Sequence, residues 1–377
     1  MDNSWQPARP GDDVADVDTP ALLLDLDRFE RNLTRLLQSV GGRVRVRPHA
    51  KSHKCVEIAL RQVAAGCVGV CVQKTSEAAA MLAGGVRDVL ITNEVVGARK
   101  IERLVALACQ HPQARLGVCV DNLGVLRQLV RQVEAQAARL DVYVELDVGQ
   151  GRCGVADPAA VVALSRAIVA CGRLTFMGLL AYHGVAQHRR GVPQRREAVL
   201  RAAQRTAAAR AALRAASLPC EIVTGGGTGT FLYEAATGVY NEVQPGSFAL
   251  MDIDYARNEP DPQSPRFEHA LTILSSVMSL HSNEGHARIT LDAGLKAFST
   301  DSGLPVPAFD GWQIRSVSDE HTVLHRVADG PPVGLGDKAV LIPSHCDPTV
   351  NLHDWIVATR GSRVEAVWRV DARGALF

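Results

Sequence analysis

The sequence reads Arg47-Pro48-His49-Ala50-Lys51-Ser52-His53-Lys54 where a short strand-like run, residues 43–47, gives way to a helical pattern. In a strand, successive side chains point to opposite faces. If this alternation continues through the proline, four polar side chains share one face and two valines share the other: Arg45, Arg47, His49 and Lys51 against Val44 and Val46. Apolar residues toward a helix layer and polar residues toward the interior are typical of the mouth of a β/α barrel.

Lys51 is the candidate reactive residue of this segment. We expect it at the carboxyl end of its strand, among cationic neighbours. Like charge and desolvation both disfavour the ammonium form, which predicts a lysine pKa below its usual value of about 10.4. A neutral lysine can form a Schiff base with an aldehyde. A basic surface turn that binds nothing is the alternative that this segment alone leaves open.

The bulk composition is that of an ordinary enzyme, with 47% hydrophobic residues, 21% charged residues and a formal net charge of +1. This balance indicates neither nucleic acid nor an anionic membrane as a partner. No run of about 18 apolar residues is present, and residues 1–13 contain no hydrophobic signal core. The nine cysteines include no C-x-x-C pair, which is typical of reduced cysteines in a cytoplasmic protein.

One pattern repeats along the first two thirds of the chain: a run rich in Val, Ile, Leu or Cys ends in polar residues, and a helical pattern follows. Eight such runs occur, at residues 43–47, 68–72, 88–91, 116–120, 141–146, 174–181, 221–223 and 242–243. Strands that alternate with helices favour parallel β/α units, and eight units close a barrel. We therefore predict a (β/α)8 TIM-type barrel over residues 18–255. An open doubly wound sheet is the alternative.

The pattern changes after Asp254. Residues 258–265 have the composition of a loop, and β-like runs follow without a long helix between them, at residues 271–278, 287–291, 322–327, 339–342, 355–359 and 364–370. The 377 residues also exceed the roughly 250 of a typical single barrel. We predict a C-terminal antiparallel β domain over residues 256–377, completed by residues 1–17.

A glycine-rich segment, Thr224-Gly225-Gly226-Gly227-Thr228-Gly229-Thr230, follows the seventh predicted barrel strand. Consecutive backbone N–H groups can bind a phosphate there, assisted by the hydroxyls. The segment is neither a Walker A loop nor a dinucleotide fingerprint. Phosphate sites in barrels fall preferentially after strands seven and eight, which favours a phosphate over a simple tight turn.

A second motif, Pro343-Ser344-His345-Cys346-Asp347-Pro348, follows a strand of the predicted β domain. Residues at i and i+2 share a strand face, so His345 and Asp347 can bind one divalent cation while Cys346 points away. An imidazole, a carboxylate and water suit Mn, Mg, Co or Zn. The H-x-D pattern is common, and a structural role is its alternative.

Three further polar residues follow barrel strands and are expected around the same opening as Lys51. Arg152 lies in Gly149-Gln150-Gly151-Arg152-Cys153-Gly154 and can pair with a phenolate or a carboxylate. Tyr182 and His188 can orient a cofactor or move protons. The Arg- and Ala-rich residues 195–216 are expected to form a solvated barrel helix.

Together the motifs resemble the D-threonine aldolase branch of the alanine-racemase-like, fold type III pyridoxal-phosphate enzymes, over nearly the whole chain. Besides the segments quoted above, the resemblance rests on Asp18-Thr19-Pro20, Tyr182-His183-Gly184, Asp319-Glu320-His321 and Thr349-x-Asn351-Leu352. It implies a head-to-tail homodimer whose active sites involve both chains.

The resemblance also implies residue roles. Lys51 would carry pyridoxal 5'-phosphate, and Arg152 would approach the phenolic oxygen of the cofactor. His188 would lie near the β-hydroxyl of the substrate. The remaining cofactor contacts would come from Tyr182, Thr224, Gly225, Gly226, Gly227 and Thr228, and the divalent metal would be bound by His345 and Asp347.

The implied activity is a pyridoxal-phosphate- and metal-dependent aldolase that cleaves a D-β-hydroxy amino acid, of the D-threonine or D-allo-threonine type, to glycine and an aldehyde. Dehydration of D-threo-3-hydroxyaspartate or D-serine to a 2-oxo acid and ammonia is the runner-up, and a 3-hydroxy-D-aspartate aldolase is a further possibility, in which Arg45 or Arg47 would serve a second carboxylate. D-serine dehydratases of this family tend to carry His-x-Cys, whereas this chain has His-x-Asp. A non-catalytic cofactor carrier would lack the β domain, and a metal hydrolase would leave Lys51 and the glycine segment without a role.

Overall fold

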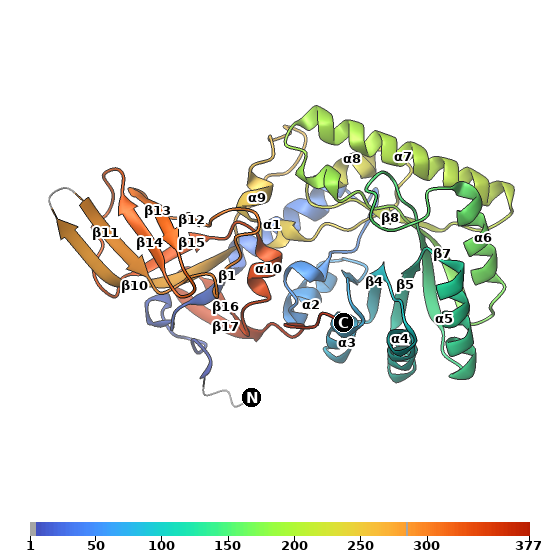
Figure 1. Cartoon of the computed structure of the whole chain (residues 1–377), viewed down its shortest axis with the longest axis horizontal. Helices are drawn as coiled ribbons and strands as arrows, with labels where there is room; N and C mark the ends of the chain where they lie inside the picture. The colour runs from blue at the N-terminus through green and yellow to red at the C-terminus, as the bar shows by residue number, and fades with distance from the viewer. Residues whose placement is uncertain (1–4, 284–285) are drawn as a thin grey trace.

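The computed structural model describes residues 5–283 and 286–377 of the chain. It has two parts, a β/α barrel and a largely antiparallel sheet, which lie side by side (Figure 1). The C-terminus returns from the sheet to the barrel beside α3 (Figure 1), where the Ser76 N–H donates to the Phe377 carbonyl at 3.0 Å. No helix in the described residues is both long enough and apolar enough to span a membrane.

The barrel contains eight parallel strands in the order β2-β9-β8-β7-β6-β5-β4-β3. Their bounds are β2 (Arg45–Val46), β3 (Val70–Val72), β4 (Asp88–Glu94), β5 (Arg115–Val120), β6 (Leu140–Glu145), β7 (Leu174–Leu180), β8 (Ile222–Gly225) and β9 (Glu242–Val243). The first and last members of this order also meet, because the Val68 N–H donates to the Val46 carbonyl at 3.0 Å and the Cys71 N–H donates to the Pro48 carbonyl at 2.8 Å. The predicted closed barrel is confirmed.

Helices follow the barrel strands, as the repeated pattern predicts. They are α2 (Val56–Ala64), α3 (Thr75–Ala83), α4 (Ala98–Gln110), α5 (Leu123–Ala135), α6 (Pro158–Val169), α7 (Val192–Ala215) and α8 (Phe231–Ala236). Local sequence explains where they begin. Asn122 caps α5 by accepting from the Gly124 and Val125 N–H groups, and Asp157 caps α6 just before Pro158.

The barrel interior is layered. A buried apolar cluster lies in its middle, formed by Cys71, Leu90, Cys119, Tyr143, Met177, Leu180 and Ile222, and Tyr182 packs against it. Nearer the amino-terminal end, the buried Arg47 guanidinium contacts Asp88, the first residue of β4, and Glu242 at 3.0 Å. Arg45 also faces Glu242, at 3.7 Å. The predicted alternation is present, but both arginines are engaged in ion pairs and are not available for a substrate carboxylate.

The second part is a nine-stranded sheet with the path β13-β14-β11-β10-β1-β16-β17, to which β15 and β12 are added beside β10. Its strands are β1 (Ala21–Asp25), β10 (Leu271–Asn283), β11 (His286–Leu291), β12 (Val306–Pro307), β13 (Trp312–Val317), β14 (Thr322–Arg326), β15 (Lys338–Ile342), β16 (Trp355–Arg360) and β17 (Arg363–Arg369). All pairs are antiparallel except β1 with β16.

Residues from 18 onward were expected to belong to the barrel, but strand β1 lies in the second sheet, where it pairs with β10 and β16. The chain enters the barrel part through α1 (Leu26–Val40), which Asp25 caps. Residues before β1 also contact this sheet, since the Gly11 N–H donates to the Val364 carbonyl at 2.8 Å. The division between residues 255 and 256 stays a prediction.

Short helical segments connect the strands, and all of them except η2, which packs on the second sheet, follow barrel strands or β15. They are η2 (Val14–Asp16), η3 (Ala50–Ser52), η4 (Val185–His188), η5 (Ser247–Ala249), α9 (Ile253–Ala256) and α10 (Cys346–Val350). No disulfide joins the nine cysteines, all of which lie among the described residues.

The ion pair beneath the barrel core predicts a large stability difference between two arginines at the same end of the barrel. Arg47→Ala removes the buried cation of the fully buried Glu242 and leaves it only the more exposed Arg45 at 3.7 Å, and we expect it to lower the free energy of unfolding by about 3–5 kcal/mol. Arg115→Ala removes a largely exposed partner of Asp141 and should cost less than about 1 kcal/mol. Urea titration of both variants measures the difference, and equal losses would contradict this interpretation.

Candidate active site

A cavity of about 430 Å³ lies among the residues at the carboxyl ends of the barrel strands. Four residues that the sequence singled out line it: Lys51, Arg152, Tyr182 and His188. The other lining residues are His49, Gln73, Thr92, Gln150, Leu180, Gly184, Val185 and Gln244. The barrel mouth therefore collects the predicted side chains from segments far apart in the sequence.

Lys51 lies in η3, the turn that follows β2, and its Nζ contacts the Asp347 carboxylate of α10. The predicted decrease of its pKa is wrong. Burial, the largest influence, would lower the pKa of Lys51, but the Asp347 carboxylate together with Tyr182 and Glu77 raises it above the ordinary lysine value. The prediction assumed only the cationic neighbours close in sequence, whereas the dominant neighbour is an anion supplied by the β domain.

His345 and Asp347 lie at the start of α10, where His345 is the residue that precedes the helix and Asp347 is in its first turn. The expectation of a shared strand face is therefore wrong, but the two side chains still converge. His345 Nε2 lies 3.9 Å from Asp347 Oδ1. This oxygen is buried and has no hydrogen-bond partner among the described residues.

The pair fits a divalent cation. His345 Nδ1 lies 2.8 Å from Asp301 Oδ2, so the Nδ1–H donates to this carboxylate and the Nε2 lone pair stays free on the side of Asp347. A free imidazole nitrogen beside an unpaired carboxylate oxygen is a suitable pair of ligands. Within residues 5–283 and 286–377, no group of three His, Cys, Asp or Glu side chains could hold a metal. Water or substrate would therefore complete the coordination.

His188 is the last residue of η4, and its Nδ1 lies 2.7 Å from Asp254 Oδ2. Burial would raise the pKa of Asp254, but Arg190 and His188 lower it below its usual range, so the carboxylate is ionised and accepts the Nδ1–H. The His188 ring also packs on Tyr255, with ring centroids 5.2 Å apart. These contacts leave His188 Nε2 as a possible proton acceptor at the edge of the cavity.

The glycine segment leaves β8 and runs buried to the start of α8. Gly226 has a φ of +74°, a conformation that favours glycine. In the described part of the chain, the N–H groups of Gly226, Gly227 and Thr228 donate to no protein acceptor. Buried backbone donors without partners are costly. Three of them in succession fit an anion such as a phosphate.

Gln187, which the sequence motifs did not identify as functional, holds this segment in place. Its Oε1 accepts from the Gly229 N–H at 3.0 Å, and its Nε2 donates to Thr230 Oγ1 at 2.7 Å. A Cβ added to Gly227 would come within 2.7 Å of Gln187 Oε1. The glycine at this position therefore permits close approach to Gln187.

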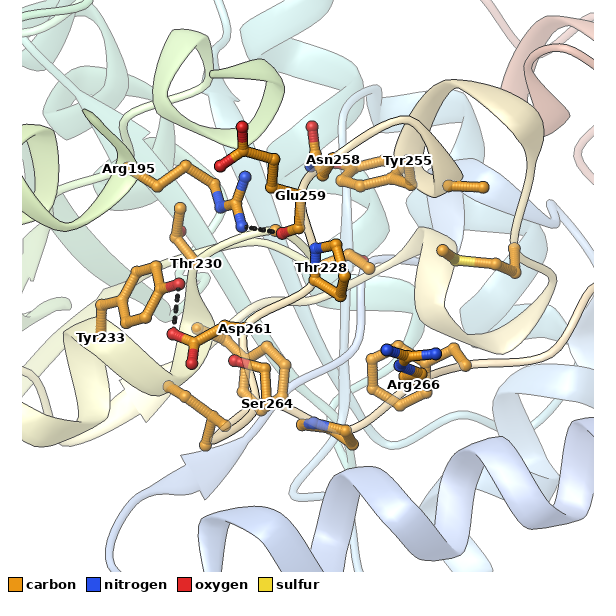
Figure 2. Close-up of a pocket in the computed structure, with 18 residues that line it drawn as sticks. Arg195, Thr228, Thr230, Tyr233, Tyr255, Asn258, Glu259, Asp261, Ser264 and Arg266 are labelled. Carbon is orange, nitrogen blue, oxygen red and sulfur yellow. Dashed lines mark hydrogen bonds between the residues drawn. The ribbon is translucent and has the colours of Figure 1, made fainter. Parts of the chain in front are cut away.

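A second cavity, of about 280 Å³, is lined in part by Thr228, Gly229 and Thr230 of the segment (Figure 2). Its lining residues are all different from those of the Lys51 cavity. Arg195 donates to the Glu259 carbonyl and the Tyr233 hydroxyl donates to Asp261, as Figure 2 shows. The two hydrogen bonds attach the loop that contains Glu259 and Asp261 to helices α7 and α8. These polar groups therefore have a structural role.

Of the remaining predicted cofactor contacts, Arg152 and Tyr182 line the first cavity, whereas Thr224 and Gly225 are not among its lining residues. The Arg152 guanidinium lies 3.8 Å from the buried Glu145 carboxylate and is about half exposed. Tyr182 packs on the apolar interior cluster. Thr224, at the end of β8, accepts from Gln244 Nε2 at 2.8 Å.

His49 is a further residue of this cavity to which the sequence assigned no role. Its Nε2 lies 3.0 Å from Thr92 Oγ1 and 2.9 Å from Gln73 Nε2, so strands β2, β3 and β4 meet there. Burial, together with the positive charge of Lys51, lowers the pKa of His49 well below its ordinary value. A neutral imidazole thus lies beside the lysine. The one sequence feature that could have identified His49 as a cavity residue is its position two residues before Lys51.

Comparison with known families first gives the class of protein. Residues 24–253, more than half of the chain, match the family described as "Alanine racemase, N-terminal domain", and residues 270–359 match "Putative serine dehydratase domain". The barrel is therefore of the pyridoxal-phosphate type that the motifs predicted. The chain belongs to the alanine racemase N-terminal domain family.

Within this family the chain is similar over nearly its full length to three aldolases. It is 45% identical over 371 residues to D-threonine aldolase from Arthrobacter sp., covering 98% of this chain and 96% of that protein. It is 43% identical over 379 residues to 3-hydroxy-D-aspartate aldolase from Paracoccus denitrificans (strain Pd 1222), covering 98% and 95%. The crystal structure of D-threonine aldolase from Filomicrobium marinum matches with a TM-score of 0.92 and 47% identity, covering 98% and 100%. The predicted resemblance is confirmed.

Glu234, buried under the glycine segment, gives a pH-dependent prediction. It accepts from the Thr230 hydroxyl at 2.9 Å, and burial raises its pKa to about 7. The folded state then holds a proton that the unfolded state releases at lower pH, so this group's contribution to stability falls as pH rises through about 7. Glu234→Gln cannot ionise and should gain stability relative to wild type between about pH 5 and pH 8. Urea titrations at about pH 5 and pH 8 measure the free energies of unfolding of the variant and of wild type. The same difference between the two proteins at both pH values would contradict this prediction.

Proposed function

We propose that this chain is a pyridoxal-phosphate- and divalent-metal-dependent aldolase, a carbon–carbon lyase that cleaves D-β-hydroxy amino acids to glycine and an aldehyde. The observation that carries the proposal is the contact between Lys51 and Asp347. It brings the lysine expected to hold the cofactor and the carboxylate expected to hold the metal into one site. The names of the three similar aldolases support the same reaction class.

The residues around the cavity fit the two groups. Lys51 would join the cofactor covalently, the unpaired N–H groups of Gly226, Gly227 and Thr228 would bind its phosphate with Thr224 and Gly225 beside them, and Arg152 and Tyr182 would flank its ring. His345 and Asp347 would hold the metal. When bound, the cofactor supplies an electron sink for the broken Cα–Cβ bond, and the metal supplies a Lewis acid for the β-hydroxyl.

The chain's own side chains would then position the substrate and move protons. His188, held by Asp254, takes the proton from the β-hydroxyl at its Nε2. Arg152 presents a permanent positive charge to the phenolic oxygen of the cofactor. His49, kept neutral by burial, adds no second charge beside Lys51. The homodimer, the metal identity and the cytoplasmic location stay predictions.

A specific observation keeps dehydration as the second candidate: residues 270–359 match a putative serine dehydratase domain. The His-x-Asp pair favours cleavage, since the family's D-serine dehydratases tend to carry His-x-Cys. The relative from Paracoccus denitrificans is named for 3-hydroxy-D-aspartate. In the described residues that line the cavity, Arg152 is the single arginine, and the proposed function assigns it to the phenolic oxygen of the cofactor. A substrate with one carboxylate, such as D-threonine, therefore fits better.

Product identity tests the proposed function. Purified protein with pyridoxal phosphate and Mn²⁺ is supplied separately with D-threonine and D-threo-3-hydroxyaspartate, and glycine and ammonia are quantified. We expect metal-dependent glycine, faster from D-threonine, and its loss by a factor of at least about 10³ in Lys51→Ala because the covalent attachment is gone. Ammonia and a 2-oxo acid without glycine would identify a dehydratase instead. If neither glycine nor ammonia forms, the result would support a non-catalytic cofactor carrier instead.

The hydrogen bond between Asp301 and His345 predicts a selective effect on metal affinity. Asp301→Asn no longer fixes the Nδ1–H tautomer of His345, and we expect Mn²⁺ to bind about tenfold more weakly. Pyridoxal phosphate affinity should not change. Isothermal titration with Mn²⁺ measures the loss, and Asp310→Asn, an exposed aspartate of the same domain, is the matched control. Equal Mn²⁺ affinity in the two variants would exclude this role for Asp301.

A further inference from the structure

Arg152 has two glutamates on its barrel side that none of the steps above use. Glu145 ends β6 and is 4% exposed, and its Oε1 lies 3.8 Å from the Arg152 guanidinium. Glu94 ends β4. Both Glu94 carboxylate oxygens and Glu145 Oε2 are buried and lack a regular hydrogen bond among the described residues, and the one neighbouring donor is the Cys153 thiol, a weak one, beside Glu94.

The strands that end in these two glutamates, β4 and β6, both pair with β5, and the two carboxyl groups are close enough for a hydrogen bond between them when one is protonated. Two ionised carboxylates in contact away from water repel each other, and one proton held between them removes the repulsion and supplies the missing donor. Burial first, and Glu94 second, raise the pKa of Glu145 to about 9. The other titratable or charged groups that face the pair are Asp121, Cys119, Cys153 and Arg152.

We propose that Glu145 and Glu94 hold one shared proton and that Glu145, as a neutral carboxylic acid, positions Arg152 without cancelling its charge. The neutral Glu145 donates its proton to Glu94 and keeps its other oxygen toward the guanidinium. Arg152 thereby keeps its full positive charge for the phenolic oxygen of the cofactor. This inference rests on the proposed function, because it assumes that the cofactor binds at the Lys51 cavity.

An ionised Glu145 would act differently. A full carboxylate at 3.8 Å would compete with the phenolic oxygen for the same guanidinium. It would also place a second negative charge beside Glu94 in a buried site, which is unfavourable without further donors. Glu145 is thus a positioning residue whose oxygen, and not whose charge, is required.

The experiment separates oxygen from charge with two substitutions at one position. Glu145→Gln keeps an uncharged oxygen beside Arg152, whereas Glu145→Leu removes the oxygen and keeps an apolar side chain of similar reach. Asp141→Asn, on the same strand but at the other end of the barrel, is the matched control, and circular dichroism confirms that each variant folds. The readouts are the dissociation constant of pyridoxal phosphate and the infrared carbonyl band of a protonated carboxylic acid.

We expect Glu145→Leu to weaken pyridoxal phosphate binding about tenfold, because loss of an outer partner weakens the contact that it supports. Glu145→Gln should change the dissociation constant less than about threefold. The wild-type carbonyl band should be present at neutral pH, disappear as pH rises through about 9, and be absent in Glu145→Gln. Should Glu145→Leu fail to fold, Glu94→Gln replaces it for the infrared readout, where the pH at which the band disappears should decrease because the repelling charge is removed.

Equal weakening by Glu145→Gln and Glu145→Leu would show that an ionised carboxylate is needed, and would overturn the inference. Unchanged affinity in Glu145→Leu, or a wild type without the carbonyl band at neutral pH, would overturn it as well. A wild type that binds no pyridoxal phosphate, in contrast, would contradict the proposed function itself.

Discussion

The contact between the Lys51 ammonium and the Asp347 carboxylate joins two parts of the chain that are 296 residues apart in sequence. Neither group would be stable alone in its surroundings, because burial penalises a single charge and a nearby opposite charge compensates for it. Two backbone contacts support this meeting point. The Cys346 N–H donates to Asp252 at 3.0 Å, and the Ala372 N–H donates to the Lys54 carbonyl at 3.0 Å. Besides the Lys51 contact, the segments that follow β15 and β17 are thus both attached to the barrel part.

His188 and His345 are both oriented by a carboxylate at Nδ1. In His188 and in His345, a carboxylate accepts the Nδ1–H, so Nε2 is the ring nitrogen that this carboxylate does not engage. The partners, Asp254 and Asp301, come from different segments, and one histidine is suited to a proton and the other to a metal. The glycine segment is held in a comparable way. Gln187 accepts from the Gly229 N–H at the end of the segment, and three preceding N–H groups remain available for an anion.

The barrel could be predicted from the sequence because each strand and its helix are encoded locally, by an apolar run, polar residues at its end and an N-cap such as Asn122. The glycine segment was recognisable for the same reason. The charge state of Lys51 was not, because its dominant neighbour is Asp347 and nothing near Lys51 in the sequence indicates it. The helix at His345 was missed because a five-residue helix has too little periodicity to detect. Asp301, Gln187 and the Glu94–Glu145 pair carry no motif, and only folding brings them to their partners.

The account depends on one site being built from both parts of the chain, and a crystal structure of the protein with pyridoxal phosphate and Mn²⁺ tests this most directly. We expect the cofactor to be joined to Lys51 with its phosphate at Gly226–Thr228, and the anomalous signal of manganese to lie between His345 Nε2 and Asp347 Oδ1. A cofactor on another lysine, or manganese bound away from Asp347, would contradict the account.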